Sequence, residues 1–419
     1  MASKKILCPY CFEEFENTQA WYQCESEERD NDGDFRCKRV TSDEYDKYWK
    51  GKDLLMRNVW QQKSGFFARL SGPKLNAQKC PQCGYNSRRF VCPHCFNWLP
   101  TEMIENGAEI ISVIGSPSSG KTNYIVALIH QLRKYGYKMN LQVIPTQLYR
   151  DGHKEESTQN LFKRMESQLF TEKTVLQKTS KKTNDIPWIF HLSQPTTGKS
   201  IYLVFYDTAG EKFTDDIKNN TKYLKESSAV ILILDTLSIN YIKEILTKKG
   251  LQDLGGASAD YKEIQTALNM FRGQSGVKIE NKPFAFVFSK FDAVIDHKND
   301  LDFAADEFVI GDKKSDSSYI KTGILNLSKI DSISESIEEA LFEQWDMGAL
   351  ASYANNWSAK RGMRDPNNPA NKYKFFGVSA FGTMPDENGE LEKVEPYRVM
   401  DPLVWILHKL GQFDIPTKK

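Results

Sequence analysis

Gly115-Ser116-Pro117-Ser118-Ser119-Gly120-Lys121-Thr122 matches the phosphate-binding loop pattern G-x-x-x-x-G-K-[ST] at every fixed position. In such a loop, successive backbone N–H groups surround the phosphate oxygens, Lys121 reaches the β- and γ-phosphates, and the Thr122 hydroxyl ligates Mg²⁺. An apolar run at 108–114 predicts a buried strand before the loop, and apolar residues at helical spacing predict a helix over 123–132. Because the motif requires this order of strand, loop and helix, it predicts a nucleoside triphosphate site that includes Asn123.

Downstream of the loop, apolar strand-like runs alternate with helical patterns. Such alternation predicts an α/β fold with a parallel sheet flanked by helices. The further strands are expected at 141–144, 187–192, 201–206, 229–234, 284–288 and 373–378. Three polar stretches, 151–185, 250–259 and 292–371, are interpreted as insertions that carry specificity, and the last contains an amphipathic helix at 334–345.

Composition sets the broad class of the protein. With 40% hydrophobic and 26% charged residues, the 419-residue chain is long enough for about two to three ordinary domains. The formal net charge of +1 provides no global attraction to nucleic acid or membrane. No apolar run approaches about 18 residues, and the N-terminus lacks the apolar core of a signal peptide. We therefore expect a cytoplasmic protein without a membrane span.

All eight cysteines lie in the first quarter of the chain, and six of them form Cys-Pro-x-Cys pairs. A C-x-x-C hairpin presents two thiolates to one tetrahedral ion, so eight thiolates predict two structural Zn²⁺ sites. The favoured assignment is one site of Cys8, Cys11, Cys24 and Cys37 and a second, ribbon-like site of Cys80, Cys83, Cys92 and Cys95. The alternative is an interleaved arrangement, in which the first and last pairs share an ion.

This double zinc-ribbon module is expected over 1–100, and the nucleotide domain with its insertions over 101–419, because Pro100 and the Asn106-Gly107 turn separate them. Residues 38–79 mix basic and aromatic side chains, which either grip single-stranded nucleic acid or pack against a zinc module. Since acidic residues intervene, we favour packing and protein docking. Protein partners are therefore expected at the zinc module and the insertions, with nucleic acid as the less favoured partner.

Two predicted strands after the loop end in polar motifs that suit Mg²⁺ and guanine. Asp207-Thr208-Ala209-Gly210 follows the strand at 201–206, where Asp207 can hold Mg²⁺ through water and the Gly210 N–H can bond the γ-phosphate. Ser289-Lys290-Phe291-Asp292 follows the strand at 284–288. The Asp292 carboxylate can accept from the guanine N1–H and amino group, a pattern that adenine does not offer.

The remaining contacts to the base come from Lys290, which would lie along the ring, and from Ser379-Ala380 after the last strand. A backbone N–H in that turn can reach the guanine O6. Each short motif is common in isolation, and the value of the set lies in its order at successive strand ends.

With these motifs in place, the chain resembles the TRAFAC class of Ras-like P-loop GTPases from Glu109 to about residue 412, through four of its five motifs. The stretch from Tyr206 to Glu211, the closing segment 401–407 and the cysteine pairs look like the bacterial double-GTPase group of GTPase-associated conflict systems. The resemblance implies a Ras-like mixed sheet and a Mg²⁺-dependent, GTP-hydrolysing switch in bacterial defence.

The chain departs from the family pattern at two places. Ser289 stands where the family has Asn, which removes an amide from the base pocket. Glu211 takes the place of the water-orienting Gln, so hydrolysis is expected to be slow without a partner. The switch threonine that completes the Mg²⁺ shell is assigned to Thr179, with Thr174 and Thr183 as alternatives. The expected catalytic residues are Lys121, Gly210, Glu211 and Thr179.

Two other functions fit the same sequence. A phosphate loop alone also suits an ATP-driven enzyme whose zinc ribbon binds nucleic acid. A nucleotide-stabilised adaptor without turnover is the third interpretation, because Glu211 replaces the usual Gln.

Overall fold

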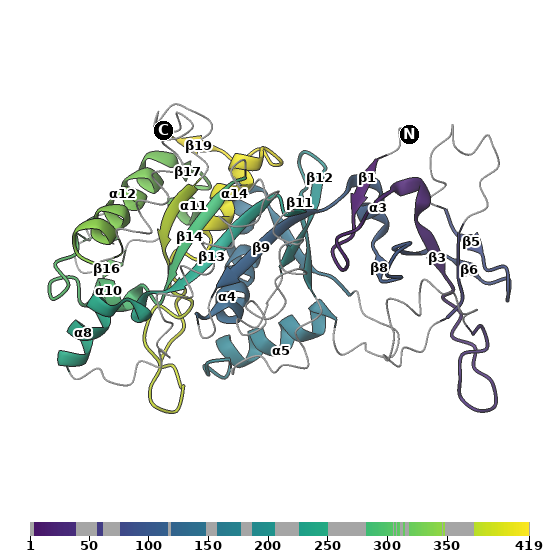
Figure 1. Ribbon diagram of the computed structural model, residues 1–419, viewed down its shortest axis with the longest axis horizontal. Helices are drawn as coiled ribbons and strands as arrows, with labels where there is room; N and C mark the ends of the chain where they lie inside the picture. Colours follow the sequence, from purple (N-terminus) through teal and green to yellow (C-terminus); the bar gives the residue numbers. More distant parts are fainter. Residues whose placement is uncertain are drawn as a thin grey trace.

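The computed structural model describes residues 4–38, 57–61, 76–115, 119–147, 157–176, 187–205, 226–249, 282–304, 306, 308–310, 313–314, 318–345, 347 and 373–418. Figure 1 shows two regions, which we call the cysteine module (the described residues of 4–99) and the α/β region (the described residues of 109–418). Among the residues that the structure describes, every helix is too short or too polar to span a lipid bilayer.

A seven-stranded sheet forms the centre of the α/β region (Figure 1), in the order β10-β11-β12-β9-β13-β14-β18. The strands β10, β11 and β12 pair antiparallel, whereas β12, β9, β13, β14 and β18 pair parallel. In sheet order they span Gln142–Pro145, Trp188–Gln194, Lys199–Phe205, Glu109–Gly115, Ala229–Asp235, Phe284–Ser289 and Tyr373–Gly377. These bounds confirm the predicted strands, and the order is that of a Ras-like mixed sheet.

The central strands are buried on both faces because their side chains alternate between two hydrophobic cores. In β13, Val230 and Leu232 belong to one core, and Ile231 and Ile233 belong to the other. Every residue of β13 and β14 is buried. This is why these strands read as continuous apolar runs rather than as alternating patterns.

Helices cover both faces of the sheet. The helices α4 (Lys121–Tyr135), α5 (Thr158–Phe170) and α14 (Asp401–Leu410) pack into one core, and α8 (Asn240–Lys248), α10 (Asp292–Asp296) and most of α12 (Leu327–Glu343) pack into the other. The predicted helix at 334–345 is the second half of α12. It begins earlier because the Asn326 side chain accepts a hydrogen bond from the Lys329 N–H at 3.1 Å and caps the helix.

Two of the three predicted insertions contain helices, and short elements complete the α/β region. The helix α5 lies within 151–185, and α10 to α12 lie within 292–371, whereas 250–259 is outside the described residues. The short elements are η2 (Gly136–Met139), η4 (Thr236–Ser238), β15 (Val309–Ile310), β16 (Lys313–Lys314), α11 (Ser318–Thr322), β17 (Leu325–Asn326) and β19 (Thr417–Lys418).

The cysteine module consists of small antiparallel sheets. Its largest sheet has the order β4-β3-β7-β8, and β1–β2 and β5–β6 are two-stranded hairpins. The strands span Lys5–Leu7, Glu14–Glu16, Trp21–Gln23, Val59–Gln61, Gln78–Lys79, Asn86–Ser87, Arg89–Val91 and Trp98–Leu99 for β1 to β8, with η1 at Asn17–Gln19. Trp60 of β4 stacks on Tyr22 of β3 with ring centroids 5.8 Å apart, which supports packing as the role of this aromatic residue in 38–79.

The two regions share one hydrophobic core through α3 (Thr101–Asn106), which contacts both β7 and β12. Met103 and Ile104 of this helix are fully buried. On its solvent side, the Tyr202 hydroxyl of β12 donates to the Glu102 carboxylate at 3.1 Å. The stretch that the sequence marks as a polar boundary is therefore a packed helix, and the division at residue 100 stays a prediction.

Candidate functional site

The phosphate loop connects β9 to α4, and its described residues are Gly115 and 119–122. Gly115 has no room for a side chain, because a Cβ there would lie 2.4 Å from the Ile233 carbonyl oxygen of β13. Gly120 has a left-handed backbone with φ of 79°, which favours glycine. A side chain is therefore disfavoured at both fixed glycines of the motif, by a close contact at Gly115 and by the backbone conformation at Gly120. Ser116, Pro117 and Ser118 lie outside the described residues.

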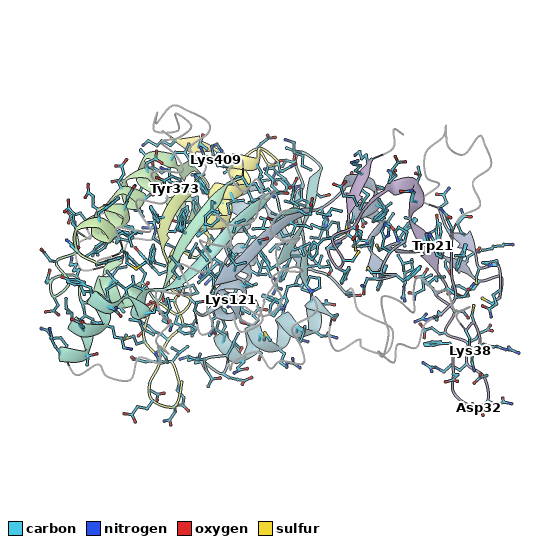
Figure 2. All side chains as sticks on the ribbon, in the orientation of Figure 1. Trp21, Asp32, Lys38, Lys121, Tyr373 and Lys409 are labelled. Atoms are coloured by element: carbon cyan, nitrogen blue, oxygen red, sulfur yellow. The ribbon has the colours of Figure 1, made fainter. Side chains whose placement is uncertain are left out.

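Lys121 and Thr122 begin α4, and both are buried. The Lys121 Nζ donates to the Gly115 carbonyl oxygen at 2.9 Å, so this side chain lies across the loop. A helix N-terminus with a lysine folded over it provides the N–H donors and the positive charge that phosphate oxygens require. Figure 2 shows Lys121 near the middle of the α/β region, at the end of β9 where α4 begins.

Asn123 follows Thr122 in α4 and contacts the segment after α5. Its Oδ1 accepts from the Leu176 N–H at 3.3 Å, which ties α4 to the segment that follows α5. Its direct role toward nucleotide stays a prediction.

The base motif follows β14. Ser289 is its last residue, and its Oγ lies 2.8 Å from the Ser119 carbonyl oxygen and 3.1 Å from the Leu234 carbonyl oxygen. The hydroxyl therefore connects the base motif to the phosphate loop, a role that the sequence did not indicate. Lys290 has a positive φ of 56°, and Asp292 begins α10 with a buried side chain.

The turn after β18 lies beside the base motif. The Phe291 N–H donates to the Val378 carbonyl oxygen at 3.0 Å, and a Cβ on Gly377 would lie 2.4 Å from the Phe291 ring. Ser379 is buried, and its Oγ accepts from the Phe381 and Gly382 N–H groups at 3.3 and 2.8 Å. The structure thus brings the phosphate loop, the base motif and the turn of Ser379-Ala380 together at one edge of the sheet.

Two buried residues at the end of β13 also contact the base motif, and the sequence analysis missed both. The Asp235 Oδ2 lies 2.6 Å from the Lys290 Nζ, and the Thr236 hydroxyl donates to the Ser289 carbonyl oxygen. The only signal in the sequence is that an acidic residue directly follows the apolar strand predicted at 229–234.

The predicted switch residues Thr179, Asp207, Gly210 and Glu211 lie outside the described residues, as does the alternative Thr183. The strand β12 ends at Phe205, two positions before Asp207, and pairs parallel with the start of β9, Leu203 with Glu109 and Val204 with Ile110. The other alternative, Thr174, donates its N–H to the Gln168 carbonyl oxygen at 3.1 Å and bridges to Glu390.

The cysteines form two clusters, and the favoured pairing predicted from the sequence is wrong. Cys8, Cys11, Cys92 and Cys95 lie together and form what we call the inner cluster; Cys24, Cys37, Cys80 and Cys83 form the outer cluster. This is the interleaved alternative, in which the first and last Cys-Pro-x-Cys pairs share a site. His94, in the last pair, is exposed and belongs to neither cluster.

The antiparallel pairing of β3 with β7 explains the interleaving. Gln23 pairs with Arg89, and Trp21 pairs with Val91. Cys24, directly after β3, is therefore carried toward the β5–β6 hairpin, and Cys92, directly after β7, is carried toward the β1–β2 hairpin. Proximity in sequence is a weak guide here, because each doubling of a loop costs only about 0.6 kcal/mol of closure entropy.

The geometry of both clusters fits zinc. In the inner cluster, the Sγ atoms of Cys8 and Cys95 lie 3.6 Å apart, and those of Cys11 and Cys92 lie 3.8 Å apart. In the outer cluster, the Sγ atoms of Cys24 and Cys83 lie 3.5 Å apart, and those of Cys37 and Cys80 also lie 3.5 Å apart. Four sulfurs about 2.3 Å from a tetrahedral ion are separated by about 3.8 Å.

The surroundings also suit thiolates. Asn97 Nδ2 donates to the Cys95 Sγ at 3.2 Å, and Asn58 Nδ2 donates to the Cys80 Sγ at 3.4 Å. Burial raises the pKa of the Cys8 and Cys95 thiols, so four ionised sulfurs at this distance need a cation between them. The donor set thus fits a structural metal, and four thiolates leave no position for a substrate.

Comparison with curated proteins found no match. Among solved structures, the chain is similar to the GTPase-like domain of S. cerevisiae Ski7 bound to GTP, with 10% identity, a TM-score of 0.31, and coverage of 73% of this chain and 51% of that one. It is also similar to a GTP-binding protein of Sulfolobus solfataricus in complex with GDP, with 12% identity, a TM-score of 0.20, and coverage of 60% and 53%. The chain spans about half the length of each.

A family model gives the more specific result. The model of Double-GTPase 2 matches residues 109–337, which include the phosphate loop, six of the seven strands of the sheet and the base motif. This match covers more than half of the chain. The chain therefore belongs to the Double-GTPase 2 family.

Proposed function

We propose that this protein is a Mg²⁺-dependent switch that binds and hydrolyses GTP, and that it carries a zinc-stabilised module for protein partners. The observation that carries the proposal is the hydrogen bond from Ser289 to the Ser119 carbonyl oxygen. It joins the phosphate loop to the base motif, so one nucleotide can contact both.

Guanine is favoured over adenine because of Asp292. Its carboxylate has only acceptor atoms, which match the N1–H and amino group of guanine, whereas the N1 of adenine is itself an acceptor. The side chain is buried, where a mismatched acceptor pair is costly. The turn at Ser379-Ala380 would supply an N–H to the guanine O6.

The chemistry of hydrolysis is attack of water on the γ-phosphate, with catalysis by positioning and neutralisation of charge. Lys121 would hold the β- and γ-phosphates, while Thr122 and Asp207 would hold Mg²⁺, which neutralises the phosphate charge when bound. The Gly210 N–H and Thr179 are the proposed contacts that relax when phosphate leaves. Because Glu211 would place an anion beside the γ-phosphate, we expect slow turnover without a partner.

The module would report the nucleotide state to a protein partner, since its shared core with β12 reaches the strand that precedes Asp207. A role in a bacterial conflict system rests on the family resemblance alone. An ATP-driven enzyme and an adaptor without turnover stay as the alternatives that the experiment separates.

Release of phosphate from GTP and from ATP tests the proposal, with Mg²⁺ present and with Lys121→Ala as the inactive variant. Lys134→Ala is the matched control, because Lys134 is exposed in the last turn of the same helix. We expect slow release from GTP that Lys121→Ala abolishes and Lys134→Ala preserves. Lys121-dependent release from ATP alone would establish the ATP-driven enzyme, and Lys121-dependent binding of GTP without release would establish the adaptor.

A further inference from the structure

Asp235 is the last residue of β13, and it contacts Lys290 of the base motif. Its carboxylate is only 3% exposed, and both of its oxygens have partners. Oδ1 accepts from the Leu237 N–H at 3.0 Å, and Oδ2 lies 2.6 Å from the Lys290 Nζ. A buried carboxylate is costly unless it is paired, and these two partners offset that cost.

Lys290 is the other half of the pair, and its backbone is held in an uncommon conformation. Its φ of 56° lies in the left-handed region, which a residue with a side chain adopts at a cost. Such a conformation persists only where the surrounding contacts impose it. The ion pair with Asp235 is one of these contacts, because it fixes the far end of the lysine side chain.

Two hydroxyl groups hold the residue just before Lys290. The buried Thr236 hydroxyl donates to the Ser289 carbonyl oxygen, and Ser289 in turn reaches the Ser119 carbonyl oxygen. Asp235 and Ser289 are also partners in the β13–β14 register. The end of β13 therefore contacts both the backbone and the side chain of the base motif.

We propose that Asp235 is a positioning residue for the nucleobase, which it serves by holding Lys290 where the lysine stem covers the ring. This inference rests on the proposed function in one respect: a nucleoside triphosphate must bind at the phosphate loop. Asp235 is then a determinant of base affinity outside the phosphate-loop and base motifs.

The test compares the affinity of Mg·GTP with that of Mg·tripolyphosphate, which lacks a base and reaches only the phosphate loop. In Asp235→Asn, one amide oxygen can still accept from the Leu237 N–H, but the charge facing Lys290 is lost. We expect the dissociation constant for GTP to rise about tenfold, the value for a lost charge-assisted hydrogen bond, while that for tripolyphosphate stays unchanged. Asp300→Asn is the control, because Asp300 forms a surface ion pair with Lys249 at 2.7 Å.

A double-mutant cycle with Lys290→Met shows whether Asp235 acts through the lysine. We expect Asp235→Asn to change GTP affinity little once Lys290 is Met, because the partner of the carboxylate is already gone. Equal losses for GTP and tripolyphosphate, or fully additive losses in the cycle, would overturn the proposal.

The test of Asp235 as a positioning residue is independent of whether the preferred base is guanine. If wild-type protein binds ATP as tightly as GTP, the proposed function fails, and the cycle is then run with ATP against tripolyphosphate. If no nucleoside triphosphate binds more tightly than tripolyphosphate, there is no base affinity to position, and the inference fails as well.

Discussion

The inner and outer cysteine clusters have the same ligands and opposite surroundings. Cys8, Cys92 and Cys95 of the inner cluster are buried in the hydrophobic core that continues through α3 into β11 and β12. The outer cluster has its own small core with Trp60, and its Cys83 is exposed. Figure 2 shows Asp32 and Lys38, which lie near the outer cluster in sequence, at the far tip of the module from Lys121.

The difference predicts two tasks for the two cysteine clusters, each of which fits a metal ion. A metal whose ligands belong to the shared core stabilises the α/β region as well as its own hairpins, because unfolding either exposes the other. A metal at the tip stabilises only the segments that it joins. We therefore expect the inner site to support the nucleotide-binding fold and the outer site to support a surface for partners.

The largest expected effect is that of Cys92→Ser in the inner cluster. Loss of this metal should cost more than about 4 kcal/mol of unfolding free energy, and GTP binding should be lost with the fold. Thermal unfolding, metal content and nucleotide binding measured on one preparation provide the check. An unchanged melting temperature after loss of one ion would contradict the proposed role of the inner cluster.

Cys83→Ser in the outer cluster should have a smaller effect. Metal content should fall from two ions per chain toward one, because the four sulfurs of each cluster fit one ion. Affinity for GTP should stay within about twofold of wild type, since distant surface changes typically shift stability by no more than about 0.5 kcal/mol. If this variant lost nucleotide binding as completely as Cys92→Ser, the two clusters would not have the different roles proposed here.

Tyr202→Phe tests the junction between the cysteine module and the α/β region. It removes the hydrogen bond to Glu102 between β12 and α3, which should cost about 1 kcal/mol. The control is Glu105→Gln on the same helix, because Glu105 contacts Lys4 through its backbone carbonyl rather than its side chain. Chemical denaturation of both variants measures the difference. Equal stability of the two would show that this bond contributes nothing to the junction.

The smallest expected effect is a pH dependence from His191, which stacks on the Tyr202 ring at 4.9 Å. Burial lowers the pKa of this imidazole from its ordinary value of 6.5, and the charge of Glu102 opposes the shift. The unfolded chain therefore binds the proton more readily than the folded chain, so stability falls as the pH drops below about 6.5. His191→Phe keeps an aromatic ring and should flatten that part of the stability profile; an unchanged profile would exclude His191 as its cause.

Most of the sheet and the phosphate loop could be predicted because their signals are local. The strand β13 is seven consecutive buried residues, and the glycines at 115 and 120 are required by close approach and by a positive φ. Such constraints involve residues that are close together in the chain, so a single sequence reveals them.

The features that escaped prediction depend on partners far apart in the chain. The metal ligands are selected by the register of β3 on β7, which places Cys24 near residue 80 and Cys92 near residue 8. The contacts of Asp235 and Ser289 follow from the parallel pairing of β13 with β14. None of these pairings can be recognised from the sequence of either segment taken alone.

We propose that the phosphate loop and Asp292 form one guanine-nucleotide site. The most direct measurement is equilibrium binding of Mg·GTP and Mg·ATP to the wild-type protein and to Asp292→Ala. Wild type should bind GTP at least about a hundredfold more tightly than ATP, and Asp292→Ala should lose most of that preference. Equal or tighter binding of ATP by the wild-type protein would show that the site does not select guanine.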